Sequence, residues 1–196
     1  MSYTNAVGIA SPPADSRYDS FTQSIHWLTL LAVAIAFGAG LVMEEMPRGP
    51  EKAQLVNLHT SIGVVLMALT AIRLSWRVAA PALQPTPGPQ LLRLGAKVVH
   101  VALYLVLFAI PITGLLMMAA KGRAVEVFGL FTLPPLMPTD RALAHSLEDV
   151  HEVLANLLLC LVGVHTAAAL LHRFVLRDSV LSRMLPVGAK TEAERR

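Results

Sequence analysis

The residues with the clearest chemical potential are seven histidines, six of which lie in or at the edge of strongly apolar stretches. They are His26, His59, His100, His145, His151, His165 and His172. His151 and His165 are 14 residues apart. On one α-helix this spacing puts both side chains within about 40° of the same face and about 21 Å apart along the axis. One helix face therefore presents two imidazoles at two depths, which indicates two separate sites.

Facing helices can supply a partner imidazole at each depth. At one depth His151 can meet His59, and at the other His165 can meet either His26 or His100. No two histidines have the i, i+4 spacing with which one helix grips a bare metal ion, so a zinc site is disfavoured. Paired axial imidazoles hold a low-spin electron-transfer haem in a helical bundle. The pattern predicts two noncovalently bound haem b groups.

Arg73 follows His59 by 14 residues, so a helix would place both on one face at the two depths. A guanidinium at the second depth is a suitable counter-ion for a haem propionate. The alternative is an arginine that extends from the end of a helix to the membrane surface. Arg73 is therefore a candidate cofactor-binding residue.

His172 follows His165 by seven residues, which places it about 10 Å nearer the membrane surface on almost the same face. There it is positioned to hydrogen-bond a quinone carbonyl and to handle the accompanying proton. Contact with lipid headgroups is the alternative.

The elements that must position these residues are membrane-spanning helices. The chain of 196 residues is 55% hydrophobic and only 15% charged, which excludes an ordinary soluble domain. Four apolar segments have the length that an α-helix needs to cross a bilayer, at residues 25–43, 55–72, 98–120 and 153–171. We expect Pro111 to kink the third segment and the Pro-rich stretch 79–89 to be non-helical. The predicted fold is all-α, an integral membrane four-helix bundle with two b-type haems.

The distribution of charge predicts the orientation of the bundle. Eleven Lys and Arg residues lie on the side of both termini, and five lie on the other side. The positive-inside rule therefore puts both termini in the cytoplasm. We expect a flexible cytoplasmic leader (1–20), the four-helix domain (21–186) and a cytoplasmic tail (187–196). The basic residues form no stripe with aromatics, so nucleic acid is not an expected partner. The single cysteine, Cys160, excludes the motif that attaches c-type haem covalently.

Five stretches of the sequence together resemble the bacterial cytochrome b561 family. They are SIHWLTLL (24–31), NLHTSIGVVLMALTAIRLSWR (57–77), HVALYLVLFAIPITGLLMM (100–118), FGLFTLPPL (128–136) and LEDVHEVLANLLLCLVGVHTAAALLHRFVLRD (147–178). The resemblance implies that His26 pairs with His165 and His59 with His151 as axial ligands of the haem irons. It leaves His100 beside the inner haem or at the quinone site, for which His172 and Lys97 are the other candidates.

The resemblance also implies a reaction. Members move single electrons between the outer surface of the bacterial inner membrane and the quinone pool, and one branch of similar size oxidises superoxide to O2 and reduces ubiquinone. Superoxide is an anion, and the cations available on the outer side are Arg48, Lys52, Lys121, Arg123 and Arg141. The same loops carry more acidic than basic residues, so any attraction must come from local arrangement.

Two other functions remain possible from the sequence. The chain would be the cytochrome b electron-conduit subunit of a membrane-bound dehydrogenase or hydrogenase if a redox protein partner docked on its outer loops. The third loop, expected on the outer side with about 30 residues, contains the apolar stretch FGLFTLPPLMP, which is suited to docking a partner or capping the outer haem. A haem-free transporter that uses the histidines as a polar pathway is the alternative from another class.

Overall fold

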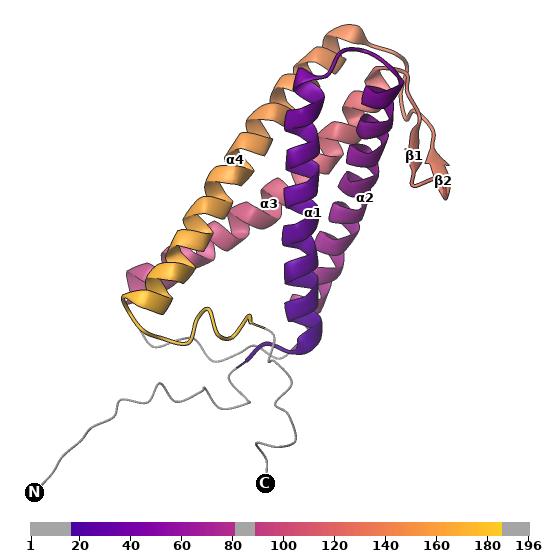
Figure 1. The fold of residues 1–196 in the computed structure, drawn as a ribbon. Coiled ribbons are helices and arrows are strands. Elements are labelled where there is room, and N and C mark those ends of the chain that lie inside the picture. The colour runs from indigo at the N-terminus through magenta and orange to yellow at the C-terminus, as the bar shows by residue number, and fades with distance from the viewer. Residues whose placement is uncertain (1–16, 81–88, 186–196) are drawn as a thin grey trace, which may run out of the picture.

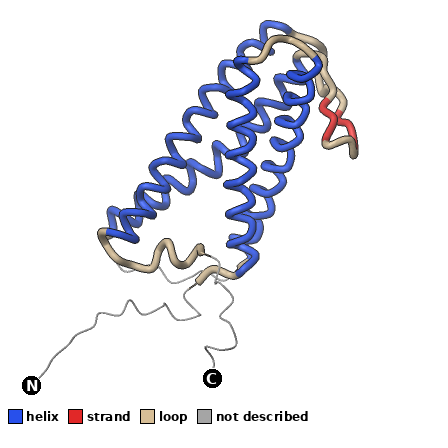
Figure 2. The backbone as a smooth tube through the Cα atoms, viewed as in Figure 1, coloured by secondary structure: helices blue, strands red, loops and turns tan. Residues whose placement is uncertain are grey.

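The computed structural model describes residues 17–80 and 89–185, which form four long helices and one short hairpin (Figures 1 and 2). The helices are α1 (Ser20–Glu45), α2 (Pro50–Ala79), α3 (Gln90–Ala120) and α4 (Arg141–Phe174). Each is long and apolar enough to cross a bilayer and contains one of the four predicted segments. The predicted membrane four-helix bundle is confirmed. We call the end of the bundle that carries His59 and His151 the outer end, after the predicted topology, and the opposite end the inner end.

Helix α4 begins earlier than expected. The side chain of Asp140 accepts a hydrogen bond from the backbone N–H of Leu143 at 3.0 Å, which is a standard N-cap. His151 therefore lies well inside α4, where the apolar segment from 153 had placed it just before the helix. The third loop is correspondingly shorter, 121–140 instead of about 30 residues. The error arose because hydropathy detects only the part of a helix that lies in hydrocarbon.

Helix α1 has a similar cap at the inner end. Asp19 accepts hydrogen bonds from the backbone N–H and the hydroxyl of Thr22, at 2.9 and 2.6 Å, and a longer one from the indole of Trp76 at 3.4 Å. Slight desolvation would raise the pKa of Asp19, but these hydrogen bonds hold it below its ordinary value. The cap is thus an anion at the helix N-terminus, where the helix dipole favours negative charge.

The helices do not all pack against one another. Close backbone approaches join α1 to α2, α2 to α3, and α3 to α4, whereas α4 makes few or none with α1 and α2. In α4 only Ala144 and Leu158 are buried. Along most of its length α4 therefore packs against α3 and stays apart from the backbones of α1 and α2 (Figure 1).

An apolar layer crosses the middle of the bundle. Val106 and Leu107 of α3 and Leu158 of α4 are buried together, and Val33 of α1 packs against them. Leu158 is seven residues from both His151 and His165, so this layer lies midway between the two depths. It separates the two ends of the bundle with side chains that cannot hydrogen-bond water.

The third loop, which joins α3 to α4 at the outer end, contains a β-hairpin that the sequence analysis did not predict. Strands β1 (Val125–Val127) and β2 (Phe131–Leu133) pair antiparallel, with Val125 opposite Leu133. The backbone N–H of Asp140 donates to the carbonyl of Ala120 at 2.9 Å, which closes the loop at its base. Three-residue strands are too short to give a periodic signal, so sequence patterning had no means of detecting them.

At the inner end, residues 175–185 run from the end of α4 across to α1 (Figure 1). The carbonyl of Arg183 accepts from the backbone N–H of Tyr18 and from the side-chain amide of Gln23, both at 3.2 Å. The indole N–H of Trp27 donates to the carbonyl of Met184 at 3.0 Å. This segment joins the two inner helix ends that do not pack directly.

The predictions for the leader, the Pro-rich linker, the tail and Pro111 concern the chain ends, the connection of α2 to α3 and the third helix. Most of the predicted leader (1–16), most of the Pro-rich linker (81–88) and the tail (186–196) lie outside the described residues. Helix α3 continues through Pro111 to Ala120 without interruption.

Candidate functional site

His59 on α2 and His151 on α4 come together at the outer end. Their ring centres are 6.0 Å apart with an interplanar angle of 67°. Both side chains are partly buried. Since α2 and α4 make few backbone contacts, the two imidazoles are the groups that bridge the space between these helices.

The hydrogen bonds of both outer imidazoles define their tautomers. The Nδ1 of His59 is 2.9 Å from the carbonyl oxygen of Ala36, and the Nδ1 of His151 is 3.0 Å from that of Ile110. A carbonyl can only accept, so each Nδ1 carries the proton and each neutral Nε2 keeps a free lone pair. A backbone carbonyl on Nδ1 is the usual outer partner of a metal-binding histidine, because it fixes the ring orientation and raises ligand basicity.

Thr113 adds a second contact to His151. Its hydroxyl donates to the Ile110 carbonyl at 2.8 Å and lies 3.1 Å from the Nδ1 of His151, where it can accept. We expect Thr113→Val to leave both haems bound but to change the midpoint potential of the outer one, because the hydrogen bond that polarises His151 is weakened. A redox titration followed in the visible spectrum measures the midpoint potentials of both haems. The potential of the inner haem is the internal control. An unchanged potential of the outer haem would contradict a role of Thr113 in tuning it.

At the inner end the structure brings both sequence candidates to His165. The ring centre of His26 is 6.3 Å from that of His165, and the ring centre of His100 is 5.2 Å from it. His26 and His165 are partly buried, whereas His100 is exposed. Three imidazoles from α1, α3 and α4 therefore meet at this depth.

The separations and contacts fit an iron between paired imidazoles. A first-row transition metal binds imidazole nitrogen at about 2 Å, so two imidazoles on opposite sides of one ion have ring centres roughly 6 Å apart. The pairs His59–His151 and His26–His165 match this value, and His100–His165 is about 1 Å too close. The buried Nδ1 of His26 has no hydrogen-bond partner among the described residues, so a polar group at the inner site still lacks its partner.

Two glycines lie next to the outer imidazoles, and at one of them the approach is too close for a larger residue. A Cβ added at Gly114 of α3 would lie 3.2 Å from Cε1 of His151, and one at Gly40 of α1 would lie 3.9 Å from Cε1 of His59. The contact at Gly114 is tighter than ordinary packing, and His151 cannot move away easily because α3 also holds its Nδ1. Glycine at 114 therefore preserves the orientation of this ring.

Arg73 lies at the inner depth, as its spacing predicted. It acts electrostatically on His26, His100 and His165. Its guanidinium is 5.6 Å from the ring centre of Tyr104. Among the described residues no carboxylate lies within ion-pair distance of Arg73. Its positive charge is therefore available to an acidic group of a bound cofactor.

His172 has a partner that the sequence analysis missed. Its Nδ1 is hydrogen-bonded to Oδ2 of Asp178 at 2.5 Å, and the other carboxylate oxygen accepts from the backbone N–H of Val180 at 3.0 Å. Both side chains are about one fifth exposed. The pair has the six-residue spacing of a helix end and the turn after it, for which sequence periodicity has no signature. Lys97 is exposed, and the structure records no polar contact for it among the described residues.

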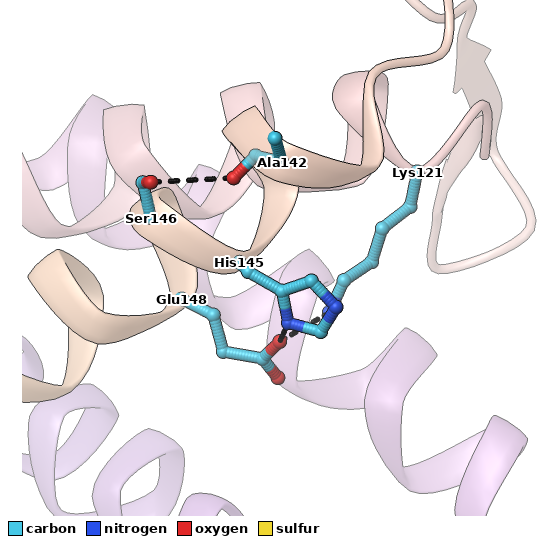
Figure 3. A network of polar contacts seen from close by, with 5 residues as sticks. All are labelled: Lys121, Ala142, His145, Ser146 and Glu148. Carbon is cyan, nitrogen blue, oxygen red and sulfur yellow. Dashed lines mark hydrogen bonds and ion pairs between the residues drawn. The ribbon is translucent and has the colours of Figure 1, made fainter.

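The outer end has a cationic hollow of ≈ 260 Å³ between the end of α3 and the start of α4. It is lined by Lys121, Arg123, Thr139, Arg141, Ala144 and His145. Lys121 is held by Glu148 at 3.1 Å, and His145 approaches the same carboxylate at 4.0 Å (Figure 3). Three of the five outer cations thus gather in one place, while Arg48 and Lys52 do not line the hollow.

Comparison with known proteins adds an independent observation. The sequence model of a family described as prokaryotic cytochrome b561 matches residues 17–187. Cytochrome b561 homolog 2 of Escherichia coli (strain K12) is 36% identical over 193 residues, which cover 94% of this chain and 95% of that protein. The probable superoxide oxidase CybB of Yersinia pestis is 33% identical, with coverage of 87% and 96%. Cytochrome b561 homolog 1 of Escherichia coli (strain K12) is 29% identical, with coverage of 87% and 98%.

Proposed function

Because the chain belongs to the prokaryotic cytochrome b561 family, we propose that it transfers single electrons across the bacterial inner membrane from superoxide to ubiquinone. Membership makes it a multi-pass membrane oxidoreductase with b-type haem, and it argues against the haem-free transporter. In the proposed reaction two superoxide anions each lose one electron and leave as O2. One ubiquinone takes up two electrons and two protons and becomes ubiquinol. Both termini then lie in the cytoplasm.

The observation that carries the proposal is the presence of two imidazole pairs at two depths along α4. We assign His59 and His151 to the outer haem b and His26 and His165 to the inner one, with Arg73 as a counter-ion at the inner end. When bound, the two haems supply one-electron carriers at two depths of the membrane. The chain itself orients the outer ligand nitrogens through Ala36 and Ile110.

The cationic hollow supports superoxide as the donor. It lies at the outer end of α4, with Ala144 and His145 within two turns of His151. The outer loops have no net positive charge, so only a local cluster of cations could attract a small anion. Lys121, Arg123 and Arg141 form such a cluster. A relative named as a probable superoxide oxidase is 33% identical to this chain.

The His172–Asp178 pair supports quinone reduction at the inner end. The carboxylate accepts from Nδ1 of His172, so Nε2 is left to face a quinone carbonyl or a water. Partial exposure of the pair gives protons from the inner aqueous side a route to this imidazole. His100, beside His165, and Lys97 are the other groups that we assign to the quinone region.

A superoxide pulse in a stopped-flow instrument tests the donor. The oxidised holoprotein is mixed with superoxide, and haem reduction is followed in the visible spectrum. We expect superoxide to reduce the haems on the time scale of the stopped-flow measurement. Vesicles that contain the protein should also form ubiquinol faster than protein-free vesicles. If superoxide does not reduce the haems, it is excluded as the donor. Haem bands that dithionite reduces would still support the assignment as a cytochrome.

Removing two charges from the hollow tests the attraction. We expect the double variant Arg123→Gln/Arg141→Gln to lower the second-order rate with superoxide about 3- to 10-fold at low ionic strength, because cationic steering is lost. The difference should shrink at high salt, where the charges are screened. Arg93→Gln, an exposed arginine at the inner end, is the matched control and should react as wild type. Equal loss in both variants would argue against a role for the hollow.

A further inference from the structure

The hairpin of the third loop lies against the side of the bundle and does not project beyond the helix ends (Figure 1). Val125 and Val127 are almost fully buried with Met118 of α3, and Val64 of α2 packs against this cluster. Ser61 of α2, 1% exposed, donates to the carbonyl of Glu126 and accepts from the N–H of Phe128, both at 3.1 Å. One serine thereby fixes the strand and its turn to α2.

These contacts set the depth of the hairpin. Ser61 lies six residues past residue 55, where the apolar segment of α2 begins, which is about 9 Å into that segment. Leu115, also packed against the hairpin cluster, lies five residues before the end of the apolar segment of α3, or about 8 Å inside it. The turn is therefore level with hydrocarbon-facing parts of both helices.

The outward surface of the hairpin tip is apolar. Residues 128–133, FGLFTL, contain no charged side chain. Phe128, Leu130 and Phe131 are 47, 81 and 51% exposed. Glu126, the charged residue of the two strands, precedes the tip. An apolar tip of aromatic and aliphatic side chains, with a charged residue beside it, suits the boundary between lipid headgroups and acyl chains.

The tip is a tight turn in which two backbone N–H groups are hydrogen-bonded within the protein. Phe128 and Gly129 both have positive φ, 49° and 72°, which is the conformation of a type I′ turn. The N–H of Leu130 donates to the carbonyl of Val127 at 2.9 Å, and Ser61 satisfies the N–H of Phe128. These two bonds lower the cost of bringing the turn close to the acyl chains, where an unpaired backbone group is expensive. A bulky Phe in the left-handed region is costly, and the bond to Ser61 offsets part of that cost.

We propose that residues 128–131 insert into the outer leaflet and contact lipid acyl chains just below the headgroups, as a short re-entrant hairpin on α2. The occupant of this surface is thus lipid, and the alternatives are water, a redox protein partner or a second copy of the chain. The proposal rests on membership in a membrane-protein family and on packing depth. It does not depend on superoxide or ubiquinone.

Site-directed spin labelling of the haem-loaded protein in vesicles tests the insertion. Leu130→Cys is introduced in a Cys160→Ala background, labelled with a nitroxide, and probed for collisions with O2 and with a water-soluble nickel chelate. Leu105→Cys in the middle of α3 is the lipid control, and Glu45→Cys at the outer end of α1 is the water control. An unchanged haem spectrum of each labelled variant verifies folding.

We expect the O2-to-nickel collision ratio at position 130 to be several-fold above that at position 45 and close to that at position 105. A ratio like that at position 45 would place the tip in water and overturn the proposal. Low accessibility to both reagents would also overturn it, in favour of a protein docked on the tip. A stoichiometric subunit in native purification would then identify a redox partner, and a cross-linked dimer a second copy.

Discussion

Replacing His151 with alanine should remove the outer haem and leave the inner one, so that haem per polypeptide falls to roughly half of the wild-type value. His151 is our assigned outer partner of His59, at 6.0 Å between ring centres, and its Nδ1 is held by Ile110 and Thr113. Alanine offers no lone pair, so one side of the iron loses its protein ligand. Pyridine haemochrome analysis against protein concentration measures the loss.

The matched control is His145→Ala on the same helix. The side chain of His145 is 82% exposed and lies at the rim of the bundle, so its loss should not change the haem content. A redox titration of His151→Ala should then show one component in place of two. Retention of both haems in His151→Ala, or equal loss in the two variants, would overturn the outer assignment.

His26→Ala and His100→Ala should differ sharply at the inner end. We expect His26→Ala to lose the inner haem, again about half of the total, and His100→Ala to keep both. Both imidazoles lie beside His165, but only the 6.3 Å separation of His26 leaves room for an iron between the rings. The exposed His100 is instead placed to influence the neighbouring ligand or a quinone.

The second measurement for the variants His26→Ala and His100→Ala is the rate of ubiquinol formation. His100→Ala should slow ubiquinol formation without changing haem content, because a polar group of the quinone region is lost while both ligand pairs remain. Loss of the inner haem in His100→Ala and its retention in His26→Ala would reverse the ligand assignment. Normal haem content and normal quinone reduction in His100→Ala would remove His100 from the site.

The local pattern of residues was sufficient to predict the helices and the two depths. A transmembrane helix satisfies its own backbone and needs only a long apolar segment, so its presence does not depend on its neighbours. The 14-residue spacing of His151 and His165 is likewise a property of one helix. For the same reason the position of Arg73 at the inner depth followed from its distance to His59. The start of α4 was predicted too late because its first turns are polar.

Which side chains meet across helices was decided by the tertiary structure. Spacing left His26 and His100 equally able to reach His165, because a helix sequence does not record the rotation of its neighbour. The carbonyls that orient His59 and His151, the cationic hollow and the His172–Asp178 pair all join groups whose approach depends on packing or on a turn. The hairpin is the clearest case, since Ser61 holds a turn 67 residues away in sequence. The depths of the two sites are therefore properties of single helices, whereas the partners at each depth depend on how the helices pack.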